Sequence, residues 1–133
     1  MAGMRGPLYS ASDLAEAREL GFELIGGDEL RKLSPADYGR RVRERVGEAP
    51  AFFSFDIDVI DPAFAPGTGT PEVAGLLPHE ALALIRSLAG MEFCGFDVVE
   101  VSPPYDPPAQ TTALLAASIA YEFLALAALA RRR

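Results

Sequence analysis

The chain has 133 residues, half of them apolar, which is enough for one domain with a hydrophobic core and without disulfide or metal staples. Its net charge of −7 argues against binding to nucleic acid or an anionic membrane and is compatible with a small cationic substrate. The one cysteine, Cys94, excludes an intramolecular disulfide, favours a reducing, cytoplasmic setting and is expected to be a small apolar filler of a strand.

The first part of the chain is predicted to hold an extended start and two helices. Residues 1–9 are predicted to form an extended segment and a Gly-Pro loop. They lack the apolar stretch of a secretory signal, so we expect that the protein is not exported. A helix is predicted over Ser12–Leu20 and a short strand over Phe22–Ile25. Ser34 is a good N-cap for a second helix that Gly47 closes.

From residue 51 onward, strands and helices alternate. The apolar run Ala51–Ile57 lacks a polar alternation, which predicts a strand buried on both faces in a parallel sheet. The loop Asp61–Leu77 is long, and loops of this length in a compact domain are usually functional. The remaining predicted elements are a helix from Pro78 to Gly90, a strand over Glu92–Val101, a proline-rich connector over 102–108 and a helix from about Gln110 to Ala130.

This alternation predicts a single α/β domain over residues 1–133, with a parallel sheet and helices on both faces, in three α/β/α layers. The segment Ala113–Ala130 is mostly alanine and contains Tyr121 and Glu122. We therefore expect a buried helix there in preference to a membrane-spanning one.

Three carboxylates fall at predicted strand ends: Asp56, Asp58 and Glu100. Residues two apart share one face of a strand, so we expect the side chains of Asp56 and Asp58 to lie together at the end of their strand. We expect the side chain of Glu100 to face the same crevice at the ends of the two strands. In open parallel sheets, ligands bind at the carboxyl ends of the strands. Charged oxygens on an apolar strand need a cation, and they suit Mg²⁺ or Mn²⁺ better than zinc or copper.

Other polar residues favour structural roles. Asp61 precedes a proline and is expected to cap a turn. His79, the only histidine, follows Pro78 in the first turn of a helix and is expected to be exposed, not a ligand. The Gly67–Thr70 run lacks the lysine and the strand-to-helix junction of a phosphate-binding loop.

Three segments carry a family resemblance: Met4–Tyr9 (MRGPLY), Ser54–Glu72 (SFDIDVIDPAFAPGTGTPE) and Gly95–Pro103 (GFDVVEVSP). They resemble, in this order, a loop, the second metal-binding signature and the following strand of the ureohydrolase (arginase/agmatinase) family. The Pro66-Gly67 and Pro71-Glu72 context is more similar to agmatinase than to arginase.

The resemblance implies the C-terminal part of an arginase-like fold and manganese-dependent hydrolysis of a guanidino compound, such as agmatine, to an amine and urea, in polyamine metabolism. It implies that Asp56 binds both ions of a binuclear manganese centre and Asp58 one of them. Glu100 would receive the substrate guanidinium, Asp97 would orient a neighbouring group, and Thr70 would belong to the substrate-facing loop. Family members commonly form homo-oligomers.

The resemblance also implies ligands that this sequence does not contain, including an Asp-Ala-His-type motif and further histidines from earlier segments. Three hypotheses stay open: the C-terminal portion of an agmatinase-like hydrolase that requires its N-terminal portion, a non-catalytic α/β fragment or interaction module, and a Mg²⁺-dependent phosphoryl-transfer domain. We also expect an open apolar sheet edge and self-association.

Overall fold

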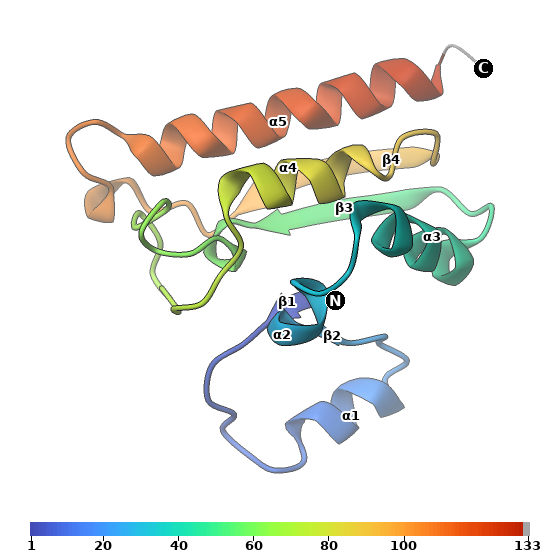
Figure 1. Cartoon of the computed structure of the whole chain (residues 1–133), viewed down its shortest axis with the longest axis horizontal. Helices are drawn as coiled ribbons and strands as arrows, with labels where there is room; N and C mark the ends of the chain where they lie inside the picture. Colours follow the sequence, from blue (N-terminus) through green and yellow to red (C-terminus); the bar gives the residue numbers. More distant parts are fainter. Residues whose placement is uncertain (132–133) are drawn as a thin grey trace.

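Two pairs of parallel strands form the sheets of the computed structural model, which describes residues 1–131 (Figure 1). β1 (Ala2–Met4) pairs with β2 (Ile25–Gly26), and β3 (Ala51–Asp56) pairs with β4 (Phe93–Val99). The helices are α1 (Asp13–Glu19), α2 (Gly27–Leu30), α3 (Pro35–Val46), α4 (Pro78–Arg86) and α5 (Thr111–Ala130). The strand and helix alternation confirms the parallel α/β class.

The local signals of α3 act as expected. The Ser34 hydroxyl accepts a hydrogen bond from the backbone N–H of Asp37 at 3.1 Å, and Gly47 ends the helix with a φ of 65°. Two boundaries differ from the prediction. The short helix α2 begins at Gly27, where we expected only a strand end, and α4 stops at Arg86, before Gly90.

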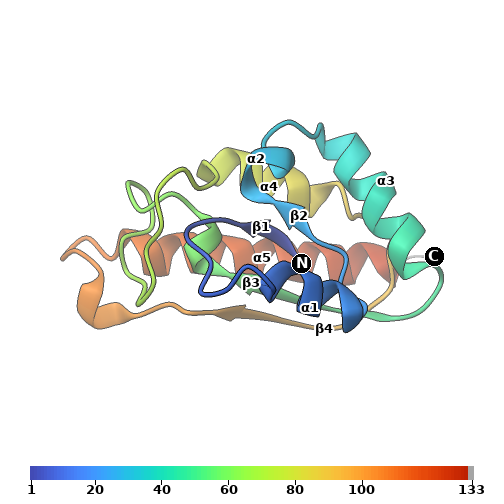
Figure 2. The same cartoon turned by 90° about the horizontal axis from the view of Figure 1, so that it is seen from below.

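The helix α5 lies along one face of the β3–β4 pair (Figure 2), and an aromatic cluster joins the helix to the strands. The ring of Phe123 on α5 lies 5.0 Å from Phe53 on β3 and 4.7 Å from Phe96 on β4, measured between centroids. Such tilted and offset pairs add to the free energy of burial. An ion pair between Arg86 and Glu122 ties α4 to α5. α5 therefore covers this side of the β3–β4 pair, where Phe53 and Phe96 are half-buried.

The other face of β3 is open, so the expectation of burial on both faces is wrong. Phe52 is 60% exposed, and Ser54 beside it is exposed as well. Cys94 is also exposed and fills no core position. The pairing shifts between Ala51–Phe93 and Phe52–Gly95, so Cys94 is the extra residue of an irregularity in the sheet.

The helix α5 is buried along one face only, which corrects the expectation of a buried helix. Ile119, Phe123 and Leu126 are buried, whereas Leu124 is 69% and Tyr121 72% exposed. By length and composition alone, α5 is the one helix within residues 1–131 that could cross a membrane. Only its buried face packs against the rest of the protein.

Asp106 supplies the cap of α5. Gln110, at the N-cap position, has a left-handed backbone and makes no side-chain cap, whereas the Asp106 carboxylate accepts hydrogen bonds from the N–H groups of Thr112 and Ala113 at 3.0 and 2.9 Å. Burial raises the pKa of Asp106, but the N–H groups of Ala113 and Thr112 outweigh it and hold this pKa below the ordinary value.

We predict that Asp106→Ala lowers the melting temperature by several degrees at pH 7, because two helix N–H groups lose their acceptor. A depressed carboxylate pKa stabilises the fold above the ordinary aspartate range and less below it. The difference between wild type and variant should therefore shrink toward pH 3 in thermal unfolding followed by circular dichroism. Asp106→Asn, which keeps one acceptor oxygen, should lose less; an equal loss at pH 7 and pH 3 would contradict the charge argument.

Candidate metal and substrate site

Asp56 and Asp58 lie together at the carboxyl end of β3. The strand ends at Asp56, and a 3₁₀ turn, η1 (Ile57–Val59), follows directly. The Asp56 Oδ1 accepts a hydrogen bond from the backbone N–H of Asp58 at 3.1 Å, so the first aspartate caps the turn that carries the second. The pair is therefore brought together by a capped turn, and not by the two-residue repeat of a strand.

The environment of Asp56 disfavours its negative charge. Burial raises its pKa, the N–H of Asp58 lowers it, and the negative charges of Asp58 and Glu100 raise it again, with a net pKa above the ordinary value. Carboxylates crowded in this way are stabilised by a bound cation or a proton.

Thr70 reaches this pair from the loop 61–77. Its hydroxyl donates a hydrogen bond to Asp58 Oδ2 at 3.0 Å. The loop returns to its start, because the N–H of Leu76 donates to the carbonyl of Val59 and the N–H of Asp61 to the carbonyl of Leu76, at 2.9 and 3.0 Å. These bonds hold the loop, and thereby Thr70, in one arrangement.

Two further residues make this loop possible. The Asp61 carboxylate accepts hydrogen bonds from the N–H groups of Ala63 and Gly75 at 3.0 and 3.2 Å, which confirms its predicted role in a turn. At Gly75, a Cβ atom would lie 2.3 Å from the backbone nitrogen of Asp61. Only glycine allows this close approach of two backbones.

Arg5, which follows β1, was not recognised from the sequence as a site residue. Its Nη2 donates to the carbonyls of Asp58 and Glu72 at 2.6 and 2.5 Å and to that of Ile60 at 3.4 Å, and its Nε donates to the carbonyl of Val73 at 3.0 Å. Arg5 therefore connects the end of β1 with η1 and with the loop 61–77. A single arginine among glycines carries little signal in the sequence, beyond the resemblance of its segment.

The position of Glu100 near Asp56 does not follow from the alternation of side chains along β4. The register pairs Asp56 with Val99, so Val98 shares the face of Phe55 and not that of Asp56. β4 ends at Val99, and Glu100 has a φ of 63°, a left-handed backbone that is rare for a glutamate. Glu100 is exposed, and its charge contributes to raising the pKa of Asp56.

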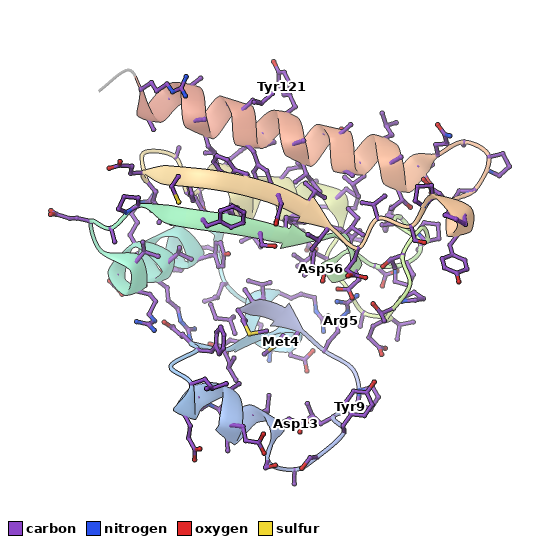
Figure 3. The ribbon with its side chains drawn as sticks, turned by 180° about the vertical axis from the view of Figure 1, so that it is seen from behind. Met4, Arg5, Tyr9, Asp13, Asp56 and Tyr121 are labelled. Atoms are coloured by element: carbon purple, nitrogen blue, oxygen red, sulfur yellow. The ribbon has the colours of Figure 1, made fainter. Side chains whose placement is uncertain are left out.

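A cavity of about 1040 Å³ lies between β1 and β3. Figure 3 labels Arg5 at the end of β1 and Asp56 at the end of β3, which both line it. Asp56, Asp58 and Thr70 line it together with Arg5 and Glu72. Glu100 is not among its lining residues within the described part of the chain. The structure thus brings the two aspartates and Thr70 to one cavity, with Glu100 beside it.

The described residues supply only some of the ligands that a metal ion requires. Within residues 1–131, no group of three or more His, Cys, Asp or Glu side chains is arranged to hold an ion. Hard divalent cations take about six oxygen ligands, so the two aspartates supply a fraction of one shell. Asp97 Oδ1, on the face of Asp56, is buried without a hydrogen-bond partner in this range. His79 is exposed, as expected.

Both backbone polar groups of Gly67 are engaged within the protein. The N–H of Gly67 donates to Thr112 Oγ1 at 2.9 Å, and its carbonyl accepts from the N–H of Ser102 at 2.7 Å. These groups tie the loop to α5 and to the segment after β4. The Gly67 N–H is therefore engaged within the protein.

The fold and the carboxylates define an α/β protein with an acidic site at the carboxyl end of a parallel strand. Residues 1–126 match the Arginase family, and the chain belongs to this family. Solved structures agree: proclavaminate amidino hydrolase from Streptomyces clavuligerus superimposes with a TM-score of 0.89 at 44% identity, over 97% of this chain and 42% of the other. The arginase from Bacillus caldovelox gives 0.79 at 26% identity, over 91% and 40%.

Curated relatives are similarly close in sequence. The guanidinopropionase of Pseudomonas aeruginosa is 47% identical over 126 residues, which is 95% of this chain and 39% of the relative. The mitochondrial agmatinase of Gallus gallus is 43% identical over 92% of this chain and 36% of the relative. The chain therefore spans about two fifths of the length of the curated relatives that it matches.

We predict that Arg5→Lys loosens the loop 61–77, because an ammonium cannot reproduce the planar fork that holds four carbonyls. Amide hydrogen exchange should speed up by about tenfold or more in this loop, while α5 stays protected. Arg18→Lys, on the exposed face of α1, serves as the control and should change neither region. Equal protection of the loop in Arg5→Lys and wild type would show that Arg5 does not fix it.

We also predict that Asp56→Asn stabilises the metal-free chain at neutral pH. A raised carboxylate pKa costs stability above the ordinary aspartate range, and this cost is absent below it, where the group is protonated in both states. In EDTA, the variant should melt about 1–3 °C higher than wild type at pH 7 and equally at pH 3.

Asp37→Asn is the matched control. Hydrogen bonds from Ser34 and Arg40 lower the pKa of Asp37, so removal of this charge should decrease the melting temperature at pH 7. A decrease for both variants would contradict the assignment of a disfavoured charge to Asp56.

Proposed function

We propose that this chain supplies the Asp56, Asp58, Thr70 and Glu100 part of a manganese-dependent guanidino hydrolase site, which converts a linear guanidino compound to an amine and urea. The observation that carries the proposal is the charge-disfavoured Asp56–Asp58 pair at the end of β3, in a chain of the arginase family. The relatives named guanidinopropionase and agmatinase support a substrate with a guanidinium group on a short chain.

Asp56 and Asp58 would hold the cation, because carboxylate oxygens suit Mn²⁺ and because a cation relieves their mutual repulsion. When bound, manganese supplies an activated water for attack on the guanidinium carbon. Thr70 orients one of these ligands by its hydrogen bond to Asp58 Oδ2. The raised pKa of Asp56 means that protons compete with the cation there, so binding weakens in acid.

Glu100 would receive the substrate. A carboxylate accepts a guanidinium in a two-pronged, charge-assisted contact, and Glu100 is exposed beside the aspartates. Its left-handed backbone departs from the alternation of β4, and its charge acts on Asp56. Strain of this kind is typical of functional positions.

The second candidate is a non-catalytic fragment or interaction module. The incomplete set of metal-binding side chains within residues 1–131 favours it for the chain on its own. The two proposals agree that the isolated chain is inactive, and they differ in what happens when the remainder of the fold is supplied.

We predict that a chimera, in which this chain replaces the matching part of Pseudomonas aeruginosa guanidinopropionase, releases urea from a guanidino acid in the presence of Mn²⁺. Asp56→Ala in the chimera should reduce kcat/KM by at least about 100-fold, because it removes a metal ligand. Glu100→Gln should raise KM by about tenfold or more, since it removes one charge from the guanidinium contact. Urea formation is measured colorimetrically.

Asp37→Asn on α3 is the control for a lost surface carboxylate and should leave kcat/KM unchanged. A folded, manganese-loaded chimera without urea release would overturn the proposed function. Urea release by the isolated chain would instead overturn the conclusion that its site is incomplete.

A further inference from the structure

Three consecutive carbonyls of the loop 61–77 accept hydrogen bonds from two arginines. Arg5 donates to the carbonyls of Glu72 and Val73 at 2.5 and 3.0 Å. Arg31, the C-cap residue of α2, donates through Nη1 to the carbonyl of Ala74. We call residues 72–74 the clamped segment, because guanidinium groups from two different elements hold its backbone.

Both arginines extend from one unit of the fold, the β1–β2 pair with α2. Arg5 follows β1, and α2 begins at Gly27, where a Cβ atom would lie 3.3 Å from the Cβ of Arg5. The missing side chain at Gly27 therefore leaves room for the stem of Arg5. At the other end of α2, Arg31 also pairs with Asp28. The two guanidinium groups thus reach the clamped segment from a common support.

Hydrogen bonds hold the clamped segment in place, whereas apolar burial contributes little. Val73 is 67% exposed, and Ala74 is exposed as well. Ala74 also has a φ of 60°, a left-handed backbone that is unfavourable for alanine. Because little apolar surface is buried here, the loss of a guanidinium donor should release the segment locally and leave the rest of the fold intact.

Pro71 connects the clamped segment stiffly to Thr70. A proline ring fixes its own φ at about −65° and restricts the backbone of the residue before it. Neither Pro71 nor Thr70 can therefore absorb a shift of Glu72 by free rotation. The Thr70 hydroxyl donates to Asp58 Oδ2 at 3.0 Å. A displacement of the clamped segment should consequently disturb this hydrogen bond.

We propose that Arg5 and Arg31 are positioning residues of the metal site: they fix the Asp58 carboxylate through the clamped segment, Pro71 and Thr70, and so strengthen cation binding without contacting the ion. The proposal rests on the metal-binding part of the proposed function, because it takes Asp58 as a ligand. It extends that function by assigning a role to α2, which ends at Arg31 outside the cavity lining.

The charge of the arginines predicts the opposite effect. A positive charge near Asp56 and Asp58 opposes the binding of another cation, so its removal alone would strengthen binding. Arg5 Nη2 lies 2.6 Å from the carbonyl oxygen of Asp58, which makes this repulsion substantial. Weaker cation binding after neutralisation of an arginine is therefore evidence for positioning and not for electrostatics.

The two arginines also differ in whether a lysine can replace them. Arg31 reaches Ala74 through one nitrogen, which a single ammonium can imitate. Arg5 uses Nε and Nη2 to reach four carbonyls, which requires the planar fork of a guanidinium. Arg31→Lys should therefore preserve the clamped segment, whereas Arg31→Gln and Arg5→Lys should release it.

The test uses the chimera with Pseudomonas aeruginosa guanidinopropionase and Mn²⁺ alone as the probe, with free Mn²⁺ measured by electron paramagnetic resonance. Arg31→Gln and Arg5→Lys should each weaken Mn²⁺ binding by about fivefold or more, and Arg31→Lys by less than about twofold. Arg40→Gln is the matched control, because Arg40 pairs only with Asp37 and Glu44 of its own helix. Unchanged or stronger binding in Arg31→Gln overturns the proposal.

A double-mutant cycle tests the route through Thr70. Thr70→Val removes the hydroxyl that bonds to Asp58, so adding Arg31→Gln to this variant should weaken Mn²⁺ binding further by less than about twofold. Independent effects that multiply would show that Arg31 does not act through Thr70, and the proposal would fail.

Hydrogen exchange of the 133-residue chain in EDTA gives a readout without metal. The amides of residues 72–76 should exchange about fivefold or more faster in Arg31→Gln than in Arg31→Lys, while α5 stays equally protected in both. The protection of α5 shows that both variants fold. Equal exchange of residues 72–76 in the two variants overturns the proposal, whatever the chimera does.

Urea release separates this proposal from the proposed function. If Mn²⁺ binding responds as expected but the unmutated chimera releases no urea from a guanidino acid, positioning is supported and the hydrolase function fails. Urea release together with unchanged Mn²⁺ binding in Arg31→Gln has the opposite meaning. At saturating Mn²⁺, the KM of Arg31→Gln should stay within about twofold, and a larger change in KM than in Mn²⁺ affinity would assign Arg31 to the substrate and overturn the proposal.

Discussion

The guanidinium of Arg5 determines how the two halves of this structure meet. It donates to the carbonyls of Asp58 and Ile60 beside β3 and to those of Glu72 and Val73 in the loop 61–77. Backbone carbonyls are strong acceptors, and an arginine presents its donors in a fixed planar fork. The position of Thr70, and through it the orientation of the Asp58 carboxylate, therefore depends on a residue at the end of β1.

The same arrangement leaves negative charge without compensation. Arg5 directs its N–H groups at carbonyls, so it does not form an ion pair with Asp56 or Asp58. Burial and the charge of Glu100 add to the cost at Asp56. In a protein with a net charge of −7, the electrostatic potential at this site favours cations over anions.

The sequence was sufficient where local chemistry decides the structure. Ser34 and Gly47 define α3, and Asp56 and Asp58 lie at the end of β3 and in the turn that follows it. It was insufficient where the outcome depends on distant backbone. The exposure of Phe52 depends on what covers β3, and the exposure of Cys94 depends on an irregularity in strand pairing. The position of Glu100 depends on its own left-handed backbone. Hydrophobic periodicity in the sequence encodes none of these features.

Cation binding at this site would be coupled to the loop 61–77, because Thr70 of that loop donates a hydrogen bond to the Asp58 carboxylate. If the ordered loop raises the affinity of the carboxylates for a cation by some factor, the cation must favour the ordered loop by the same factor. Arg5 holds the loop through the carbonyls of Glu72 and Val73, so it would contribute to cation binding without contacting the ion.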